Sequence, residues 1–434
     1  MAPIAVVLAG RGHTVTGSDM RDSPVVGILR AAGVTVHVGH DAAHVDSADV
    51  VLYSTAVPAD NVELTTARAA GIPVRHRSGI LASLTAQLAT VGVAGTHGKT
   101  TTTALITTML SGPGSVPSAI VGGDVDGMPA GALVGTGDDL VLECDESDGT
   151  LDVLAPRHLL VTNVDVDHLD YFDTFGAVQA SFVDAALRAT GTVVLNADDP
   201  ASAPVRAAVP RAVTFGRHGD VRIESTTPTA DGMTVGLVGR FGPHTAHTLL
   251  RGDHNAMNIA AAFTMACELG VEPATALERI ADFGGVARRF TEHGTHNGAL
   301  LVDDYAHLPA EISAAVATLR AHPAVTGRVV AVFQPNRFHR IAAMADAYAD
   351  CFGDADLVVI TDVYASGTER IEGVTGHMVV DAVRAAHPDA LVEWAPARAD
   401  IVRTVGAYLR PGDGCISMGC GDIATFPTDL GIDP

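Results

Sequence analysis

A single lysine stands in a glycine-rich segment of this 434-residue chain. Of the 27 basic residues only Lys99 is a lysine, and it lies in the sequence Gly95-Thr96-His97-Gly98-Lys99-Thr100. Such a loop can surround phosphate oxygens with backbone N–H groups, while the lysine reaches the outer phosphates and the threonine hydroxyl binds magnesium. A capped glycine turn is the alternative, but it does not explain why one ammonium group is kept where every other basic side chain is a guanidinium. We therefore predict a nucleoside triphosphate site.

Polar side chains follow the next two apolar runs of the chain. Glu143 begins an acidic segment at residues 143–148, and the segment 163–170 contains His168. The carboxyl ends of parallel strands meet at one edge of a sheet, where ligands bind. Hard oxygen ligands suit magnesium. A solvated acidic turn and a structural histidine are the alternatives when each segment is taken alone.

The surrounding pattern predicts an α/β protein with three domains. Short β-branched runs alternate with alanine-rich stretches at the start, and a strand, a glycine loop and a helix open the second block. A third block alternates strands and helices as a doubly wound sheet does. We place the domains at residues 1–89, 90–291 and 292–434. In the third domain we expect strands at 299–302, 329–333, 357–360 and 415–418, and helices near 309–320, 339–350, 376–386 and 397–406.

The composition restricts the partners of the protein. A formal charge of −23 argues against binding to nucleic acid or to an anionic membrane, because both require clustered Lys and Arg. The five cysteines are scattered without a CxxC pair, and the sequence has no apolar run of about 18 residues. We expect a soluble cytoplasmic protein without nucleic acid or membrane partners.

Taken together, the motifs resemble those of the Mur ligases over nearly the whole chain. The resemblance is carried by segments 95–101, 143–148, 163–170, 196–199, 252–255, 289–290, 303–307 and 333–335. The last two, with segment 418–423, are most similar to the branch of the family that adds L-alanine. The resemblance implies an N-terminal Rossmann-like domain, a central P-loop ATPase domain and a C-terminal Rossmann-like domain.

The resemblance also implies an ATP-dependent amide ligase of peptidoglycan precursor synthesis. Its substrates would be UDP-N-acetylmuramate, L-alanine and ATP, with two Mg²⁺ ions. The muramate carboxylate would take the γ-phosphate to form an acyl phosphate, which the alanine amine then attacks. The family's carbamoylated lysine, absent from the alanine-adding branch, is excluded because Lys99 is the only lysine. The enzyme would be a monomer or a homodimer.

Particular residues inherit roles from this resemblance. The catalytic residues would be Lys99, His168, Arg289 and His307. ATP would be bound by Gly95, Thr96, His97, Gly98, Lys99, Thr100, Thr101, Asn255, Arg289 and Asp304. The metal ligands would be Thr100, Glu143 and His168. The amino acid would be bound by His307, Arg337 and Arg340, although a solvated pair on a helix is the alternative for the two arginines.

Several features depart from the family pattern. Leu308 and Asn336 each stand where the family usually has a histidine, and segment 78–81 lacks a usual glutamate. The resemblance also leads us to expect a truncated N-terminal domain, without the first strand and the glycine loop that receive the uridine diphosphate in the family. We expect a misplaced start, with both encoded upstream. The alternatives are a murein-peptide or folylpolyglutamate ligase, or a nucleotide-binding homologue that has lost ligation.

Overall fold

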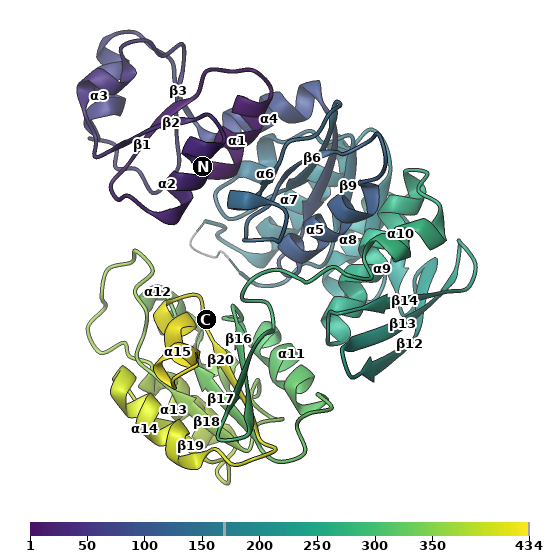
Figure 1. Ribbon diagram of the computed structural model, residues 1–434, viewed down its shortest axis with the longest axis vertical. Helices are drawn as coiled ribbons and strands as arrows, with labels where there is room; N and C mark the ends of the chain where they lie inside the picture. The colour runs from purple at the N-terminus through teal and green to yellow at the C-terminus, as the bar shows by residue number, and fades with distance from the viewer. Residues whose placement is uncertain (168–170, 433–434) are drawn as a thin grey trace. The chain divides into compact units, whose positions relative to one another are not determined.

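The strands that the structure describes form four sheets, and the chain divides into two units (Figure 1). The computed structural model describes residues 1–167 and 171–432. The first unit comprises Met1–Ser225, Val235–Thr248 and Asn255–Val286. The second comprises Thr226–Thr234, Leu249–His254 and Ala287–Pro434.

The N-terminal strands are parallel, as predicted, but they form two separate sheets. β1 pairs only with β2, and β3 only with β4, among the described strands. The elements are α1 (Ala2–Gly10), β1 (Thr16–Asp19), α2 (Pro24–Ala31), β2 (Thr35–Val38), η1 (Ala42–Val45), β3 (Val51–Tyr53), α3 (Val62–Ala69), β4 (Val74–His76) and α4 (Arg77–Gln87). Side chains of α1 and α4, such as Val7 and Leu84, pack into the core of the larger sheet that follows. The upstream strand and glycine loop stay a prediction.

The largest sheet has ten strands in the order β14-β13-β12-β11-β10-β9-β5-β8-β6-β7. The strands are β5 (Ala89–Ala94), β6 (Ser118–Ile120), β7 (Ala132–Leu133), β8 (Asp139–Glu143), β9 (His158–Val161), β10 (Val193–Asn196), β11 (Val213–Gly216), β12 (Val221–Thr229), β13 (Gly232–Gly239) and β14 (His244–Thr248). The helices are α5 (Lys99–Leu110), η2 (Pro129–Gly131), α6 (Thr150–Val153), α7 (Phe175–Arg188), η3 (Pro200–Ser202), α8 (Ala203–Ala208), α9 (Asp253–Glu268) and α10 (Pro273–Arg279).

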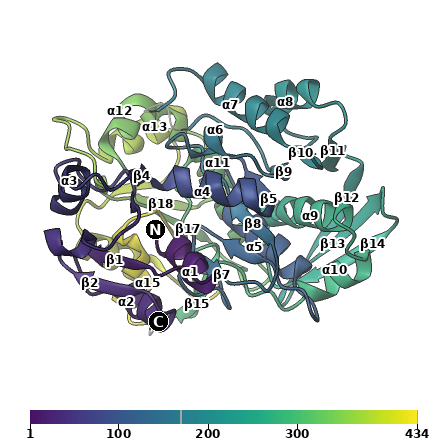
Figure 2. The ribbon, with the colours of Figure 1, turned by 90° about the horizontal axis from the view of Figure 1, so that it is seen from above.

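Strand β5 is the centre of this sheet and determines where the candidate site lies. Its apolar residues Val91, Val93 and Ala94 are buried, as expected for a parallel strand covered on both faces. It pairs in parallel with β8 on one side and with β9 on the other. Helix α5 leaves the end of β5 through the glycine loop and packs against β5 and β8 (Figure 2). The glycine loop and the two predicted polar segments therefore follow three adjacent strands, at the carboxyl ends of those strands.

The second unit contains the predicted doubly wound sheet, with six strands in the order β15-β16-β20-β17-β18-β19. The strands are β15 (Thr291–His296), β16 (Ala299–Asp304), β17 (Val329–Phe333), β18 (Leu357–Ile360), β19 (Val392–Trp394) and β20 (Gly414–Met418). The helices are α11 (Pro309–Arg320), α12 (Phe338–Met344), η4 (Ala345–Tyr348), α13 (His377–Ala386), α14 (Arg398–Tyr408), η5 (Asp422–Thr425) and α15 (Phe426–Asp429).

This sheet confirms the four strands predicted for the third domain and adds two. β15 is an antiparallel edge strand whose residues are mostly polar and incompletely buried, so it carries little of the hydrophobic signal used to predict strands. β19 has only three residues. The predicted helix at 339–350 divides into α12 and the 3₁₀ helix η4.

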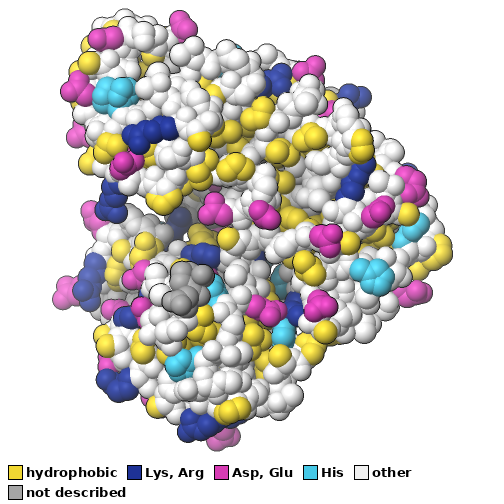
Figure 3. Space-filling view, in the orientation of Figure 1, with side chains coloured by type: hydrophobic (Ala, Val, Ile, Leu, Met, Phe, Trp, Pro, Cys, Tyr) yellow, Lys and Arg dark blue, Asp and Glu magenta, His cyan; other side chains and the backbone are white. Residues whose placement is uncertain are grey.

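Charged side chains of both signs lie on the surface drawn in Figure 3. On the face drawn in Figure 3, acidic, basic and histidine side chains are intermingled with apolar ones, and no continuous basic patch is visible there. None of the helices in the described part of the chain combines the length and the apolar run of a membrane-spanning segment.

Candidate functional site

The glycine loop between β5 and α5 has a backbone that only glycine fits. Gly95 has a φ of +129° and Gly98 a φ of +79°, in the region that side chains disfavour. A Cβ atom on Gly95 would lie 2.1 Å from Thr162 Oγ1, and one on Gly98 would lie 2.4 Å from Asn258 Oδ1. Helix α5 begins at Lys99 with no acidic residue in its first turn. Its free N–H groups and positive dipole end therefore favour an anion at this loop.

The loop is fixed to the segment that follows β9. The backbone N–H groups of Thr96 and His97 donate to the carbonyl oxygen and to Oδ1 of Asn163, at 3.1 Å and 2.8 Å. Asn163 Nδ2 donates back to the His97 carbonyl at 3.0 Å. The His97 ring lies 3.0 Å from Asp165 Oδ2. Asn163 thus holds the loop in place, and the His97 ring interacts with the side chain of Asp165.

Lys99 lies within the loop and carries a positive charge. Its Nζ donates to the carbonyl of Gly95 at 2.5 Å and to both carboxylate oxygens of Glu146 at 3.0 Å. Burial alone would lower the pKa of Lys99, but the charges of Glu146, Asp145 and Glu143 outweigh it and raise that pKa. The ammonium group is therefore protonated where a phosphate would bind.

Thr100 and Glu143, which we assign to a metal ion from the sequence, lie side by side. The Thr100 hydroxyl donates to Glu143 Oε1 at 3.0 Å, and the Gly122 N–H donates to Oε2 at 2.6 Å. Burial raises the pKa of Glu143, so a nearby cation would stabilise its charged form. These hard oxygen donors fit Mg²⁺. His168 lies outside the described residues, and within the described part of the chain no group of three or more His, Cys, Asp and Glu side chains is arranged to hold a metal.

The side-chain amide of Asn258 links Asn255 on helix α9 to helix α5, and this amide was not predicted from the sequence. Asn258 Nδ2 donates to Asn255 Oδ1 at 3.0 Å, and Thr102 on α5 donates to Asn258 Oδ1 at 3.2 Å. Asn255 and Thr101 are buried. The spacing of Asn255 and Asn258 on one helix was the available signal.

In the second unit, the predicted nucleotide residues gather at the end of β16. Asp304 accepts hydrogen bonds of 2.7 Å from the N–H groups of Phe290 and Ala306. Burial raises the pKa of Asp304 to about 6. The Arg289 guanidinium lies 5.0 Å from the centre of the Tyr305 ring, within cation–π range. Asp304 is thus a fixed acceptor, and Arg289 is oriented by an aromatic face.

His307 lies at the start of α11, and its position is fixed by hydrogen bonds. Its N–H donates to Glu311 Oε2 at 3.0 Å, and its carbonyl accepts from the Tyr348 hydroxyl at 2.9 Å. Its Nδ1 lies 3.1 Å from the Tyr305 carbonyl. His307 is therefore held in place in the short segment that follows Asp304.

The two departures in the second unit have structural roles. Asn336 is buried and accepts a hydrogen bond from Arg340 Nη1 at 2.8 Å, so this position still orients the arginine. Leu308 is buried and directly precedes α11. Arg337 directly precedes α12 and has a φ of +60°, and its N–H donates to the Tyr364 carbonyl at 2.9 Å. Arg337 and Arg340 thus belong to one fixed turn after β17.

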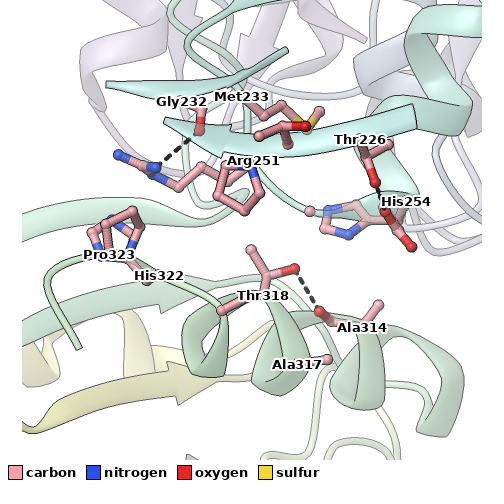
Figure 4. A pocket seen from close by; sticks show the side chains of 15 residues that line it. Thr226, Gly232, Met233, Arg251, His254, Ala314, Ala317, Thr318, His322 and Pro323 are labelled. Atoms are coloured by element: carbon pink, nitrogen blue, oxygen red, sulfur yellow. Dashed lines mark hydrogen bonds between the residues drawn. The ribbon is translucent and has the colours of Figure 1, made fainter. Parts of the chain in front are cut away.

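A cavity of about 320 Å³ in the second unit is lined by none of the predicted site residues that the structure describes. Its walls come from segments 226–233 and 251–254 and from α11 (Figure 4). Arg251 donates to the carbonyl of Gly232, and the Thr318 hydroxyl to that of Ala314, so these polar groups are satisfied by the protein. Nδ1 of His254 is enclosed without a partner among the described residues. Burial lowers the pKa of His254 to about 4.

Two charged residues near the loop were not assigned a role from the sequence. Glu146 stands in the acidic segment, but only the structure shows that it holds Lys99. Arg77, at the start of α4, donates to Asp145 and Asp148. Its only signal was its place directly after a strand, which Arg217 and Arg240 share.

Comparison with known proteins gives a consistent result over the whole chain. Residues 1–88 match the family model "Mur ligase family, catalytic domain", residues 93–266 match "Mur ligase middle domain", and residues 288–421 match "Mur ligase, glutamate ligase domain". These three matches together cover most of the chain.

Individual relatives cover the chain almost completely. The UDP-N-acetylmuramate–L-alanine ligase of Bradyrhizobium sp. (strain ORS 278) is 40% identical over 98% of this chain and 93% of its own length. The enzyme of the same name from Rubrobacter xylanophilus is 39% identical over 99% and 96%. The crystal structure of UDP-N-acetylmuramate–alanine ligase from Thermotoga maritima aligns with a TM-score of 0.80 at 26% identity, covering 99% of this chain and 95% of that one.

Proposed function

The chain belongs to the Mur ligase family, and we propose that it joins L-alanine to the carboxylate of UDP-N-acetylmuramate at the expense of ATP. The products are the amide, ADP and phosphate, and the reaction belongs to peptidoglycan precursor synthesis. The relatives that are about 40% identical over nearly the full length carry this activity in their names, which supports the assignment.

The observation that carries the proposal is the charge arrangement at the ends of β5 and β8. A protonated Lys99 lies inside a glycine loop at the start of α5, and Thr100 and Glu143 offer oxygen donors beside it. A helix N-terminus and a buried ammonium bind transferable phosphates, and paired oxygen donors bind the accompanying cation.

The residues of the chain perform separate tasks in this reaction. The loop N–H groups and Lys99 hold the phosphates and stabilise the charge that develops on the γ-phosphoryl oxygens during transfer to the muramate carboxylate. Thr100 and Glu143 would hold Mg²⁺, which would neutralise phosphate charge as a Lewis acid. We assign the second metal position to His168 because of the sequence resemblance to the Mur ligases.

Asn255 of the first unit and several residues of the second unit bind the remaining groups. Asn255 and Asp304 contact the nucleotide, with Asp304 at the ribose, and Arg289 reaches the γ-phosphate. His307, Arg337 and Arg340 line the amino-acid site, where a guanidinium binds the alanine carboxylate with paired hydrogen bonds.

We propose domain boundaries near residues 89 and 291. We also propose that the enzyme acts in the cytoplasm, where ATP is available.

The test is ADP release measured with each substrate omitted in turn. We expect release that depends on both L-alanine and UDP-N-acetylmuramate, together with formation of the amide. ADP release that requires a tripeptide or a folate instead of L-alanine would reassign the substrate. ATP binding without any ligation would support the nucleotide-binding homologue.

A further inference from the structure

A guanidinium at the start of α4 joins two carboxylates of the acidic turn that follows β8. Arg77 Nη2 lies 2.7 Å from Asp148 Oδ2 and 2.9 Å from Asp145 Oδ2, and Arg77 Nε adds a third contact of 3.0 Å to Asp148. The side chain of Asp148 is 10% exposed and that of Arg77 is 27% exposed. These are charge-assisted contacts in a partly buried place, so they are stronger than ordinary surface ion pairs.

The two carboxylates flank Glu146, which holds Lys99. Glu146 is 1% exposed, and both of its oxygens lie 3.0 Å from Lys99 Nζ. The other oxygen of each flanking carboxylate fixes the turn: Asp145 Oδ1 accepts from the Ser147 N–H at 3.0 Å, and Asp148 Oδ1 accepts from the Thr150 N–H at 3.1 Å. One arginine of the N-terminal region therefore fixes the turn on both sides of Glu146.

We propose that Arg77 is a positioning residue for the phosphate loop. By joining Asp145 to Asp148 it sets the turn in which Glu146 orients the Lys99 ammonium. The inference rests on the proposed function, because it gives the N-terminal region a direct part in forming the ATP site.

Removal of Arg77 has two physical consequences. Asp145 and Asp148 lose their shared cation and repel each other, which moves the turn that carries Glu146. The two carboxylates also leave uncompensated negative charge beside the site of an anionic nucleotide. Both effects weaken binding of the phosphates, whereas the L-alanine site contains none of these residues.

The experiment compares Arg77→Ala with Arg11→Ala in the full chain. Arg11 also joins the N-terminal region to the central sheet, but its Nη2 contacts Asp138 at 3.3 Å, just before β8 begins. Calorimetry with Mg²⁺ and a non-hydrolysable ATP analogue should show affinity reduced at least about tenfold for Arg77→Ala, and by less than about twofold for Arg11→Ala. Equal losses in the two variants would overturn the proposal.

Two further measurements separate positioning from general loss of structure. Arg77→Lys, which keeps one charge, should recover part of the affinity, and in the ligation assay Arg77→Ala should lower kcat while the KM for L-alanine stays unchanged. If Arg77→Ala does not fold, Asp148→Asn removes the negative charge from the same contact with a side chain of equal size, and unaltered ATP affinity in it would refute the role. Wild-type protein that binds the analogue without alanine-dependent turnover would refute the proposed function alone, because the affinity comparison does not depend on ligation.

Discussion

The phosphate loop and the segments of the second unit that we assign to the nucleotide and the amino acid both use left-handed backbone, but on different residues. In the loop, positive φ falls on Gly95 and Gly98, where no Cβ has room. In the second unit it falls on five side-chain-bearing residues that the structure describes, and three of them, Arg288, Phe290 and Arg337, lie in these segments at φ between 55° and 60°. In the loop a side chain would collide with Thr162 or Asn258. In the second unit these positions carry side chains, and the fold accepts strain of about 1 kcal/mol or more at each position.

Hydrogen bonds hold the strained residues of the second unit. The Arg288 N–H donates to Thr291 Oγ1 at 2.9 Å, the Phe290 N–H to Asp304, and the Arg337 N–H to the Tyr364 carbonyl. Backbone strain therefore coincides with each arginine-bearing turn that we assign to substrates. The following variants test this contrast between the two regions.

The largest effect should come from Lys99→Arg. A planar guanidinium cannot replace the compact ammonium inside the loop, so we expect ligation to fall by more than about a hundredfold with the fold intact. Steady-state kinetics and circular dichroism measure the two quantities. Retention of more than about a tenth of the turnover, equivalent to a loss below about 1.4 kcal/mol, would contradict the phosphate role.

Gly98→Ala should destabilise the first unit. The alanine would have to adopt the positive φ of Gly98, and its Cβ would lie 2.4 Å from Asn258 Oδ1. We therefore expect a loss of about 3 kcal/mol in the free energy of unfolding and weaker ATP binding. Denaturant unfolding gives the stability. Gly114→Ala is the control, because its φ is also positive but its Cβ position is open. Similar losses in both would show that φ alone, and not contact with α9, decides the effect.

His254 should make the protein less stable in acid. Its pKa of about 4 lies below the ordinary 6.5, so the folded state binds fewer protons than the unfolded state between these values. The stabilisation is complete above pH 6.5 and is lost as the pH falls toward 4, by on the order of 2 kcal/mol. Unfolding at several pH values should show a shallower slope for His254→Gln than for wild type. His247→Gln, at an exposed histidine, should keep the wild-type slope.

Arg337→Ala should have the smallest effect and the most selective one. We expect the KM for L-alanine to rise about tenfold while the KM for ATP changes little, because Arg337 follows β17 in the turn assigned to the amino acid. Arg337→Gly should lose as much affinity for L-alanine as Arg337→Ala. Its free energy of unfolding should be about 1 kcal/mol higher than that of Arg337→Ala, since glycine accepts the φ of +60°. Equal effects on both substrates would assign Arg337 to domain closure or structure.

The contrast also explains what could be predicted from the sequence. Strands β16, β17, β18 and β20 were predicted because buried parallel strands are continuous apolar runs. The loop was predicted because its groups are contiguous. Contacts between distant segments, such as Lys99 with Glu146, leave no periodic signal, and one arginine among 26 could not be singled out. The polar edge strand β15 was missed for the same lack of hydrophobic pattern.

The division of the N-terminal strands into two small sheets has a consequence for local opening. Two-stranded sheets are marginally stable in water, and β1 to β4 contain residues that are half-buried or exposed. Helices α1 and α4, by contrast, contribute to the core of the ten-stranded sheet. Amide hydrogens of β1 to β4 should therefore exchange with solvent through low-energy fluctuations, while those of β5 and β8 exchange only on global unfolding.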